Sequence, residues 1–255
     1  MPFSSYNFVF MMSDKISNSQ IKHLRALQLK KFRQKYNQFI VEGIKSVDEF
    51  IGSSLKCLGL YGNEEAISRF HKQIDSSICF QTNTKQLTQI SGLKKPQGVL
   101  GVFEMPSLQT LNKTAPLILL LDDIRDPGNL GTIVRTAEWF GLDQVVCSTT
   151  SVDCFNAKVI QASMGSLSRV KVHYRDLPEL VKELPEHVLL QTDMVGEDYR
   201  KVKINKCMLV IGNEGKGVSD ELAAMAHQTI TIPRKGEAES LNAAISAAIL
   251  LAELT

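Results

Sequence analysis

The sequence predicts an α/β protein in which a smaller N-terminal α/β unit precedes a larger unit built on a parallel sheet. Short apolar stretches alternate with helical ones along most of the chain, which is typical of strands and helices that succeed one another. A polar segment with prolines, EMPSLQTLNKTAP (104–116), divides this alternation into two series. The 255 residues, 44% of them hydrophobic, are enough for two ordinary domains with full cores.

The first series predicts a βαβαβαβ unit within residues 15–104, which a linker at 105–115 follows. Its strands are expected at 39–43, 57–62, 77–82 and 98–104, and its helices at 44–52, 64–73 and 84–92. The doublet Met11-Met12 precedes a polar, helix-initiating stretch. We hypothesise that translation begins there, and we expect residues 1–14 to be a disordered extension.

The segment QIKHLRALQLKKFRQKY (20–36) predicts a basic helix. Ile21, Leu24 and Phe32 recur at helical spacing, so the helix would bury one side and direct its cations outward. The segment holds no acidic residue. A run of like charges can be a solvated face or a surface that contacts phosphates, and the lack of any acid favours the second. The expected RNA-binding residues are Lys22, Arg25, Lys30, Lys31 and Arg33.

After the polar segment, the alternation resumes and predicts a parallel sheet with helices on both faces. The strands are expected at 116–122, 144–149, 169–174, 188–193, 207–214 and 229–233. The helices are expected at 130–140, 156–167, 177–184, 219–226 and 240–254. Ligands of such sheets lie beyond the carboxyl ends of the strands, where loops enter helices.

Three of these loops combine glycine with polar residues. In DPGNLGTIVRTAEWFG (126–141), Pro127 and Gly128 suit a tight turn, and Asn129 stands where it could cap the next helix. Arg135 lies further along that helix. A simple cap at Asn129 and a surface salt bridge at Arg135 are the alternatives to a functional role.

The other two loops are VIGNEGKGVSDEL (210–222) and IPRKGEAESLN (232–242). Three glycines in the first let its backbone approach a ligand, although the pattern is neither a P-loop nor a GxGxxG loop. Glu214 serves no helix there, so a structural explanation for it is weak. Ser240 and Asn242 stand at the mouth of the last helix, where both could be caps.

Taken together, the three loops resemble the motifs of the SpoU family of RNA ribose 2′-O-methyltransferases, in order and in spacing. The resemblance covers residues 116–255, and FIVEG (39–43) with KPQGVLGVF (95–103) is similar to the substrate-binding domain often attached to these enzymes. It implies a ribosomal-protein-like N-terminal domain and a trefoil-knotted C-terminal domain, an exception to the unknotted rule. It also implies S-adenosylmethionine bound in the knot, no metal, and a homodimer with active sites at the subunit interface.

The resemblance also implies roles for single residues. The positions that match catalytic residues are Asn129, Arg135, Glu214, Ser240 and Asn242. The positions that match cofactor contacts, made largely through the backbone, are Gly212, Ile232 and Leu241. A sulfonium carries a good leaving group, so the enzyme has to align a ribose hydroxyl and help it lose a proton. An arginine stays charged, so we expect Arg135 to stabilise the developing alkoxide and anchor a phosphate.

Two positions depart from the family pattern. Arg234 stands where relatives often carry Met, and Gln161 stands where they often carry Arg, so neither is given a role.

The composition agrees with a cytoplasmic protein. The net charge of +2 is too small to indicate a nucleic-acid partner by itself. No run approaches the roughly 18 apolar residues of a membrane helix. Five scattered cysteines without a CxxC pair indicate reduced thiols and a cytoplasmic protein.

We favour ribosomal RNA as the substrate and transfer RNA as the second choice. A non-catalytic RNA-binding relative and a dinucleotide or phosphate enzyme are the alternatives.

Overall fold

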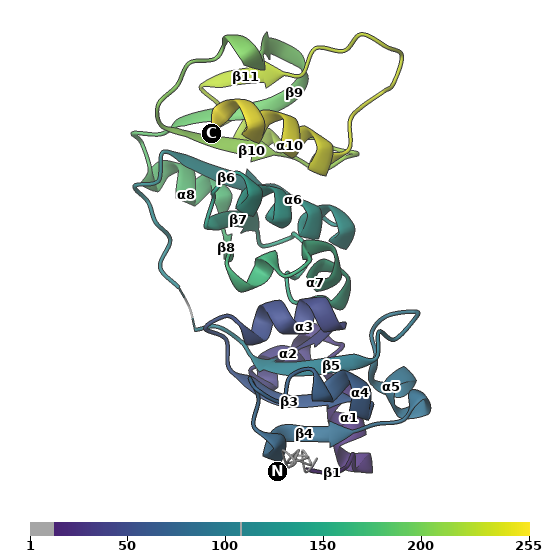
Figure 1. Cartoon of the computed structure of the whole chain (residues 1–255). Coiled ribbons are helices and arrows are strands. Elements are labelled where there is room, and N and C mark those ends of the chain that lie inside the picture. Colours follow the sequence, from purple (N-terminus) through teal and green to yellow (C-terminus); the bar gives the residue numbers. More distant parts are fainter. Residues whose placement is uncertain (1–12, 108) are drawn as a thin grey trace, which may run out of the picture. The chain divides into compact units, whose positions relative to one another are not determined.

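The protein consists of two compact units. The computed structural model describes residues 13–107 and 109–255. Its first unit ends at Pro106 and its second begins at Ser107 (Figure 1). This division falls within the expected linker, 105–115, while the domain limits themselves stay a prediction.

The first unit contains a mixed five-stranded sheet, as far as the described residues show, in the order β1-β4-β3-β5-β2. The sheet is parallel from β1 through β4 to β3, whereas β5 runs antiparallel to both β3 and β2. The strands are β1 Ser13–Lys15, β2 Gln38–Glu42, β3 Cys57–Gly62, β4 Cys79–Gln81 and β5 Val99–Glu104. Ser13 and Asp14 therefore belong to the sheet and not to the expected extension 1–14, of which residues 1–12 lie outside the described part of the chain.

The expected basic helix at 20–36 is in fact two helices, α1 (Asn18–Ala26) and α2 (Lys30–Tyr36). Arg33 corrects our expectation, because its side chain is only 4% exposed. Its guanidinium donates to the carbonyls of Leu27 and Gln28 at 3.0 and 2.9 Å. Arg33 thus stabilises the turn between the helices by satisfying carbonyls beyond the end of α1, and it does not present its charge to solvent.

Successive side chains of β2 point to opposite faces of the first sheet and pack into two separate cores. Phe39 lies on one face, where its ring centroid is 5.8 Å from that of Phe50 and 5.9 Å from that of Phe103. The next residue, Ile40, joins Leu24 of α1 in the core of the opposite face. The remaining helices are α3 Ile44–Ile51, α4 Glu64–Ser68 and α5 Thr84–Ile90. They begin where expected, although α4 ends earlier.

The second unit is built on a parallel sheet, as predicted. Among the described residues the sheet has six strands in the order β11-β9-β10-β6-β7-β8, and each pair of neighbours is parallel. The strands are β6 Leu117–Leu121, β7 Gln144–Ser148, β8 Lys171–Arg175, β9 Val188–Asp198, β10 Cys207–Ile211 and β11 Gln228–Thr231. β9 is longer than expected: its first half pairs with both β10 and β11, and after a register shift its last residues, Glu197 and Asp198, pair with β11 again.

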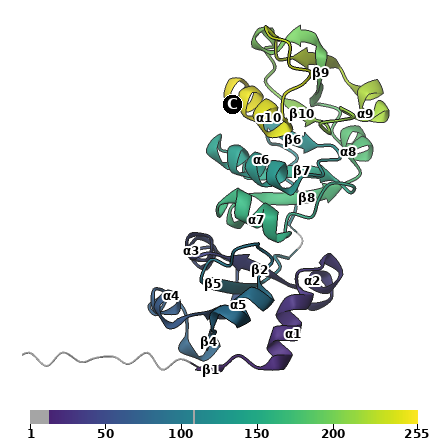
Figure 2. The same cartoon turned by 90° about the vertical axis from the view of Figure 1, so that its right-hand side faces the viewer.

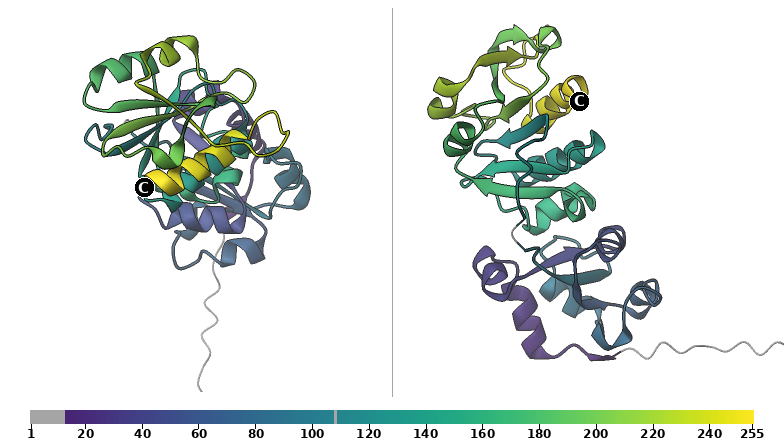
Figure 3. Two further views of the ribbon diagram at one scale, coloured as in Figure 1. Left: turned by 90° about the horizontal axis from the view of Figure 1, so that it is seen from above. Right: turned by 90° about the vertical axis from the view of Figure 1, so that its left-hand side faces the viewer.

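Helices cover both faces of this sheet (Figures 2 and 3). α6, α7 and α10 lie on one face, and α8 and α9 lie on the other. Leu120 of β6 and Val210 of β10 pack with Leu180 of α8. Their neighbours in the same strands, Leu119 and Leu209, point to the opposite face because side chains alternate along a strand. The helices are α6 Pro127–Trp139, α7 Ala157–Ser163, α8 Leu177–Glu183, α9 Asp220–Met225 and α10 Ala243–Leu254.

Gly131 allows α6 and α7 to approach closely. A Cβ at this position would lie 2.5 Å from the Cβ of Ala162 and 2.6 Å from the carbonyl oxygen of Val159. The second glycine of the DPGNLG motif therefore serves helix packing, and it holds the N-terminal turn of α6 beside the carboxyl end of the sheet.

Candidate active site

Two of the three predicted loops are tied together by a buried aspartate. β6 and β10 pair in register, with Leu121 opposite Ile211, so the loops that follow them start side by side. The amide of Asp122 donates to the carbonyl of Ile211 at 2.9 Å. The buried carboxylate of Asp122 accepts from the amide of Ser219 at 2.9 Å. Asp122 thus connects the loop after β6 to both ends of the loop after β10.

The loop after β10 folds tightly on itself. A Cβ on Gly212 would come closer than 3.0 Å to backbone atoms of Gly217, so glycine is required there. Gly217 itself has a φ of +72°, a conformation that favours glycine. Asn213 fastens the loop: its Oδ1 accepts from two amides at the tip, at 2.9 and 3.2 Å, and its Nδ2 donates to the carbonyl of Asp123 at 2.9 Å. Asparagine in a turn commonly bonds to its own backbone, which is a signal that our sequence analysis passed over.

Asn129 is not the cap of α6. The helix begins at Pro127, and Asp126 caps it by accepting from the amide of Asn129 at 2.9 Å. Proline suits this first helical position because its missing N–H would have no partner there. The prediction of a cap at Asn129 was therefore wrong, and its side chain can turn toward the other loops.

The side chains of Asn242, Asn129 and Glu214 form a hydrogen-bonded chain that joins all three loops. Asn242 caps α10, because its Oδ1 accepts from the amides of Ala244 and Ile245 at 2.9 and 3.3 Å. Its Nδ2 then donates to Oδ1 of Asn129 at 2.9 Å, and Nδ2 of Asn129 donates to Oε1 of Glu214. Each amide has one accepting oxygen and one donating nitrogen, so the capping bond at α10 determines the orientation of both amides.

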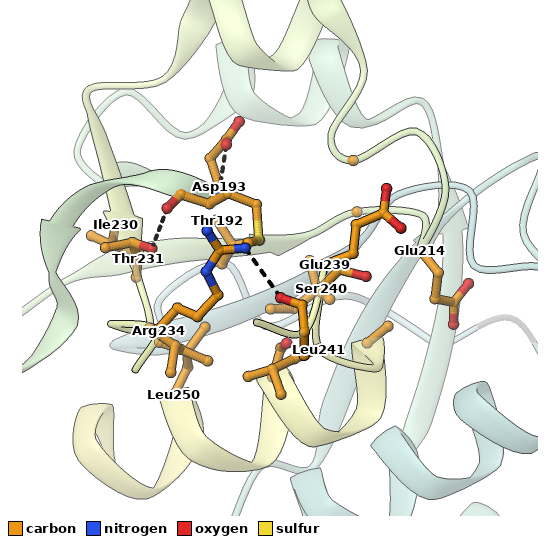
Figure 4. A pocket seen from close by; sticks show the side chains of 18 of the residues that line it. Thr192, Asp193, Glu214, Ile230, Thr231, Arg234, Glu239, Ser240, Leu241 and Leu250 are labelled. Carbon is orange, nitrogen blue, oxygen red and sulfur yellow. Dashed lines mark hydrogen bonds between the residues drawn. The ribbon is translucent and has the colours of Figure 1, made fainter. Parts of the chain in front are cut away.

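An open cavity of about 750 Å³ is lined by the loops after β10 and β11, the middle of β9 and the start of α10 (Figure 4). Its lining includes five of the predicted site residues, namely Gly212, Glu214, Ile232, Ser240 and Leu241. Ile211, Ile230 and Leu250 add apolar surface. The volume falls within the range of pockets that bind small molecules. Asn129 and Asn242 adjoin the cavity through Glu214.

Charged side chains of both signs line the cavity. Three are acidic and three basic: Asp193, Glu214, Glu239, Lys216, Arg234 and Lys235. Arg234, which had no predicted role, lies in the lining and donates from Nη1 to the carbonyl of Ala238 at 3.2 Å (Figure 4). S-adenosylmethionine carries a sulfonium, an ammonium and a carboxylate, so a lining with both signs fits it. The close approach at Gly212 fits an adenosyl group held by backbone atoms.

Arg135 does not lie with the other predicted catalytic residues. It is exposed on α6, is not part of the cavity lining, and makes no hydrogen bond or ion pair with another described residue. Trp139 follows it one turn later and is 85% exposed. The expected alternative, a surface salt bridge at Arg135, is therefore also not seen among the described residues.

Of the predicted RNA-binding residues, four are exposed, namely Lys22, Arg25, Lys30 and Lys31. In the described part of the chain, no group of three or more His, Cys, Asp or Glu residues is arranged to hold a metal ion. None of the helices described is both long and apolar enough to span a bilayer.

Comparisons with known proteins agree with this geometry. A family model described as the SpoU rRNA methylase family matches residues 116–252, and one described as the MRM3-like substrate binding domain matches residues 18–101. The 23S rRNA (guanosine(2553)-2′-O)-methyltransferase RlmP of Bacillus subtilis is 34% identical over 93% of this chain and 96% of its own. Two solved structures are similar over almost the whole chain. A TrmH-family protein from Porphyromonas gingivalis has a TM-score of 0.84 at 34% identity and covers 94% of this chain and 98% of its own. An AdoMet-bound rRNA methyltransferase from Sinorhizobium meliloti has a TM-score of 0.82 at 30% identity and covers 95% and 97%.

Proposed function

Because the chain belongs to the SpoU rRNA methylase family, we propose that it methylates a ribose 2′-hydroxyl of ribosomal RNA. It is an S-adenosylmethionine-dependent methyltransferase of that family. The observation that carries the proposal is the chain of hydrogen bonds from Asn242 through Asn129 to Glu214 at the edge of the cavity. This hydrogen-bonded chain supports the proposal because it holds a carboxylate and an amide in fixed orientation at the edge of the cavity.

The loops after β10 and β11 hold the cofactor, largely through their backbones. S-adenosylmethionine supplies an activated methyl group that leaves a neutral thioether. Gly212, Ile232 and Leu241 line the cavity and offer N–H and C=O groups to the adenosyl moiety. Gly212 is needed because any side chain there would fill the space that the loop closes. Glu214 and Ser240, on the same lining, position the ribose hydroxyl for in-line attack.

Arg135 acts across a subunit interface in this proposal. Its helix exposes Trp139 to 85%, and Ile245 at the start of the neighbouring α10 is 51% exposed. Large apolar side chains exposed on these two neighbouring helices support an interaction surface there. A second copy of the chain covers them in a homodimer, and Arg135 reaches the partner's cavity. There its guanidinium stabilises the developing alkoxide and anchors an RNA phosphate.

The trefoil knot and the cytoplasmic location complete the proposal. Asn242 lies just ahead of α10 and donates to Asn129, which follows β6. This bond supports a knot in which the C-terminal segment is held among the loops at the end of the sheet. None of the five cysteines forms a disulfide, which suits a reducing compartment. The first unit binds the RNA substrate, an assignment supported by the substrate-binding family that matches residues 18–101 and by the exposed lysines of α1 and α2.

Transfer of a labelled methyl group to RNA tests the function. The purified protein is incubated with labelled S-adenosylmethionine and total RNA from a strain that lacks the gene, and the modified nucleotide is mapped. We expect label in ribosomal RNA at one ribose 2′-oxygen. Label only in transfer RNA would overturn the choice of substrate. Tight cofactor binding without transfer to any RNA would instead indicate a non-catalytic relative.

A further inference from the structure

The helices α1 and α2 present a surface that is both basic and aromatic. No acidic residue occurs between Ile16 and Val41. Five exposed cations belong to these two helices: Lys22, Arg25, Lys30, Lys31 and Lys35. A positive surface with no acid near it in sequence favours a polyanionic partner.

Three rings form a ladder along this surface. Phe32 and Tyr36 are one helical turn apart, with ring planes 13° from parallel and centroids 6.2 Å apart. The ring of His23 meets Tyr36 edge-on, with centroids 4.6 Å apart. A contact of 2.7 Å between Nε2 of His23 and Oε1 of Gln38 holds the imidazole in place. The ladder is therefore supported at one end while Tyr36 stays 39% exposed.

Two lysines lie over the rings of this ladder. The Nζ of Lys31 is 5.0 Å from the centroid of Phe32, and the Nζ of Lys35 is 5.5 Å from that of Tyr36. Both side chains belong to exposed residues with flexible stems. A flat ligand can take their place over the rings while the ammonium groups move to phosphates beside it.

This combination identifies an unpaired nucleotide better than a duplex or an apolar protein surface. Duplex RNA is contacted mainly through phosphates and 2′-hydroxyls, which gives exposed rings nothing to stack on. A splayed base stacks on aromatic rings while cations follow its backbone. An apolar protein partner would gain nothing from five cations.

The platform ends close to the point where the chain leaves the first unit. The amide of Met105 donates to the carbonyl of Asn37, the residue after Tyr36, at 2.9 Å. RNA seated on the platform therefore lies at the linker end of this unit.

We propose that His23, Phe32 and Tyr36 form a stacking platform for an unpaired RNA base, with Lys31 and Lys35 contacting the flanking phosphates. The proposal rests on the proposed function and deepens it, since it makes the substrate an RNA with an exposed single-stranded nucleotide.

Binding of two labelled RNA probes to the full-length protein tests the platform. One probe is a single-stranded oligoribonucleotide of mixed sequence, and the other is the same strand annealed to its complement. We expect Tyr36→Leu to weaken single-strand binding roughly 10-fold or more, the loss typical of one stacked base, and to leave duplex binding unchanged. Tyr36→Phe, which keeps the ring, should bind as the wild type does.

Charge variants separate stacking from phosphate contacts. Replacing both Lys31 and Lys35 by Gln should reduce the slope of log affinity against log salt for the single strand by about 1.4, or about 0.7 per phosphate. The matched control replaces Lys45 and Lys72 by Gln, two exposed lysines elsewhere on the first unit, and should leave that slope nearly unchanged. Thermal unfolding of each variant establishes that it is folded.

Three outcomes bear on the proposal. Equal loss of both probes in Tyr36→Leu, or no loss of either, overturns the platform. Equal slopes for the two lysine pairs overturn the phosphate contacts. Methyl transfer to ribosomal RNA is measured in parallel: a wild-type protein that transfers no methyl group but binds single strands through Tyr36 contradicts the proposed function and leaves the platform standing.

Discussion

Replacing Gly212 by alanine tests whether the loop after β10 is the cofactor cradle. The added Cβ would come closer than 3.0 Å to backbone atoms of Gly217 and Val218. These atoms cannot swing aside, because paired hydrogen bonds of 2.9 and 2.8 Å join Asn213 to Gly217. The loop must open, and overpacking of this kind costs about 1–3 kcal/mol. If the opening moves backbone groups away from the cofactor, the Kd for S-adenosylmethionine rises by roughly 5- to 150-fold.

Calorimetric titration with S-adenosylmethionine measures this effect, and the same loop offers a matched control. A Cβ on Gly215 would be 3.6 Å from its nearest neighbour, Oδ1 of Asn213, which is ordinary contact. Gly215→Ala should therefore change the binding free energy by no more than about 0.5 kcal/mol. If Gly212→Ala binds the cofactor as tightly as the wild type, the loop is not the cradle. Equal losses in both variants would mean that loop flexibility, and not the close approach, is what binding requires.

Further substitutions test the polar chain, the interface and a buried carboxyl. Asn129→Ala should lower kcat roughly 100-fold and leave the unfolding midpoint nearly unchanged, since its hydrogen bonds are exposed; a kcat near that of the wild type would remove Asn129 from the site. Trp139→Glu should convert the proposed homodimer to monomers in sedimentation velocity without loss of fold, and a variant that stays dimeric would refute the proposed interface. Mixing Arg135→Ala with Asn129→Ala protein should restore about a quarter of wild-type activity if Arg135 acts in the partner's site, because only heterodimers keep one complete site, and should restore none if it acts in its own chain. Burial raises the pKa of Glu42 despite hydrogen bonds from the Ser91 hydroxyl and a backbone amide. The folded protein then binds this proton more tightly than the unfolded chain does, so the stability of the wild type relative to Glu42→Gln should fall as the pH rises above about 4.5; a pH-independent difference in unfolding free energy would contradict this.

Much of the second unit could be predicted because its central strands, β6, β7 and β10, are buried almost throughout. A strand buried on both faces, such as LILLL (117–121), carries no polar residue, so it appears in the sequence as an uninterrupted apolar stretch. The break between α1 and α2 could not be predicted in the same way, because neither glycine nor proline marks it. It depends on Arg33, whose side chain turns back to bond two carbonyls. In the sequence Arg33 is one more cation in a basic run.

The candidate site was predictable where the residue type itself carries the chemistry, and not where a residue acts by holding another segment. Glu214 stood out because a carboxylate in a glycine loop has no structural task. Asp122 and Asn213 passed unnoticed, although they secure the same loop. Their partners lie 97 and 90 residues away in the sequence, so only the pairing of β6 with β10 reveals their roles.

The geometry of α6 supports the proposal that the active site is shared between two chains. Asn129 faces the loops at the carboxyl end of the sheet, where it bonds Glu214 and Asn242. At 3.6 residues per turn, Arg135 projects about 120° away from Asn129 around the same helix. The side of α6 that holds Gly131 is committed to α7, so the helix cannot rotate to bring both residues to one cavity. If both take part in catalysis, Arg135 must serve the cavity of another copy, and the exposed Trp139 beside it lies where that copy would dock.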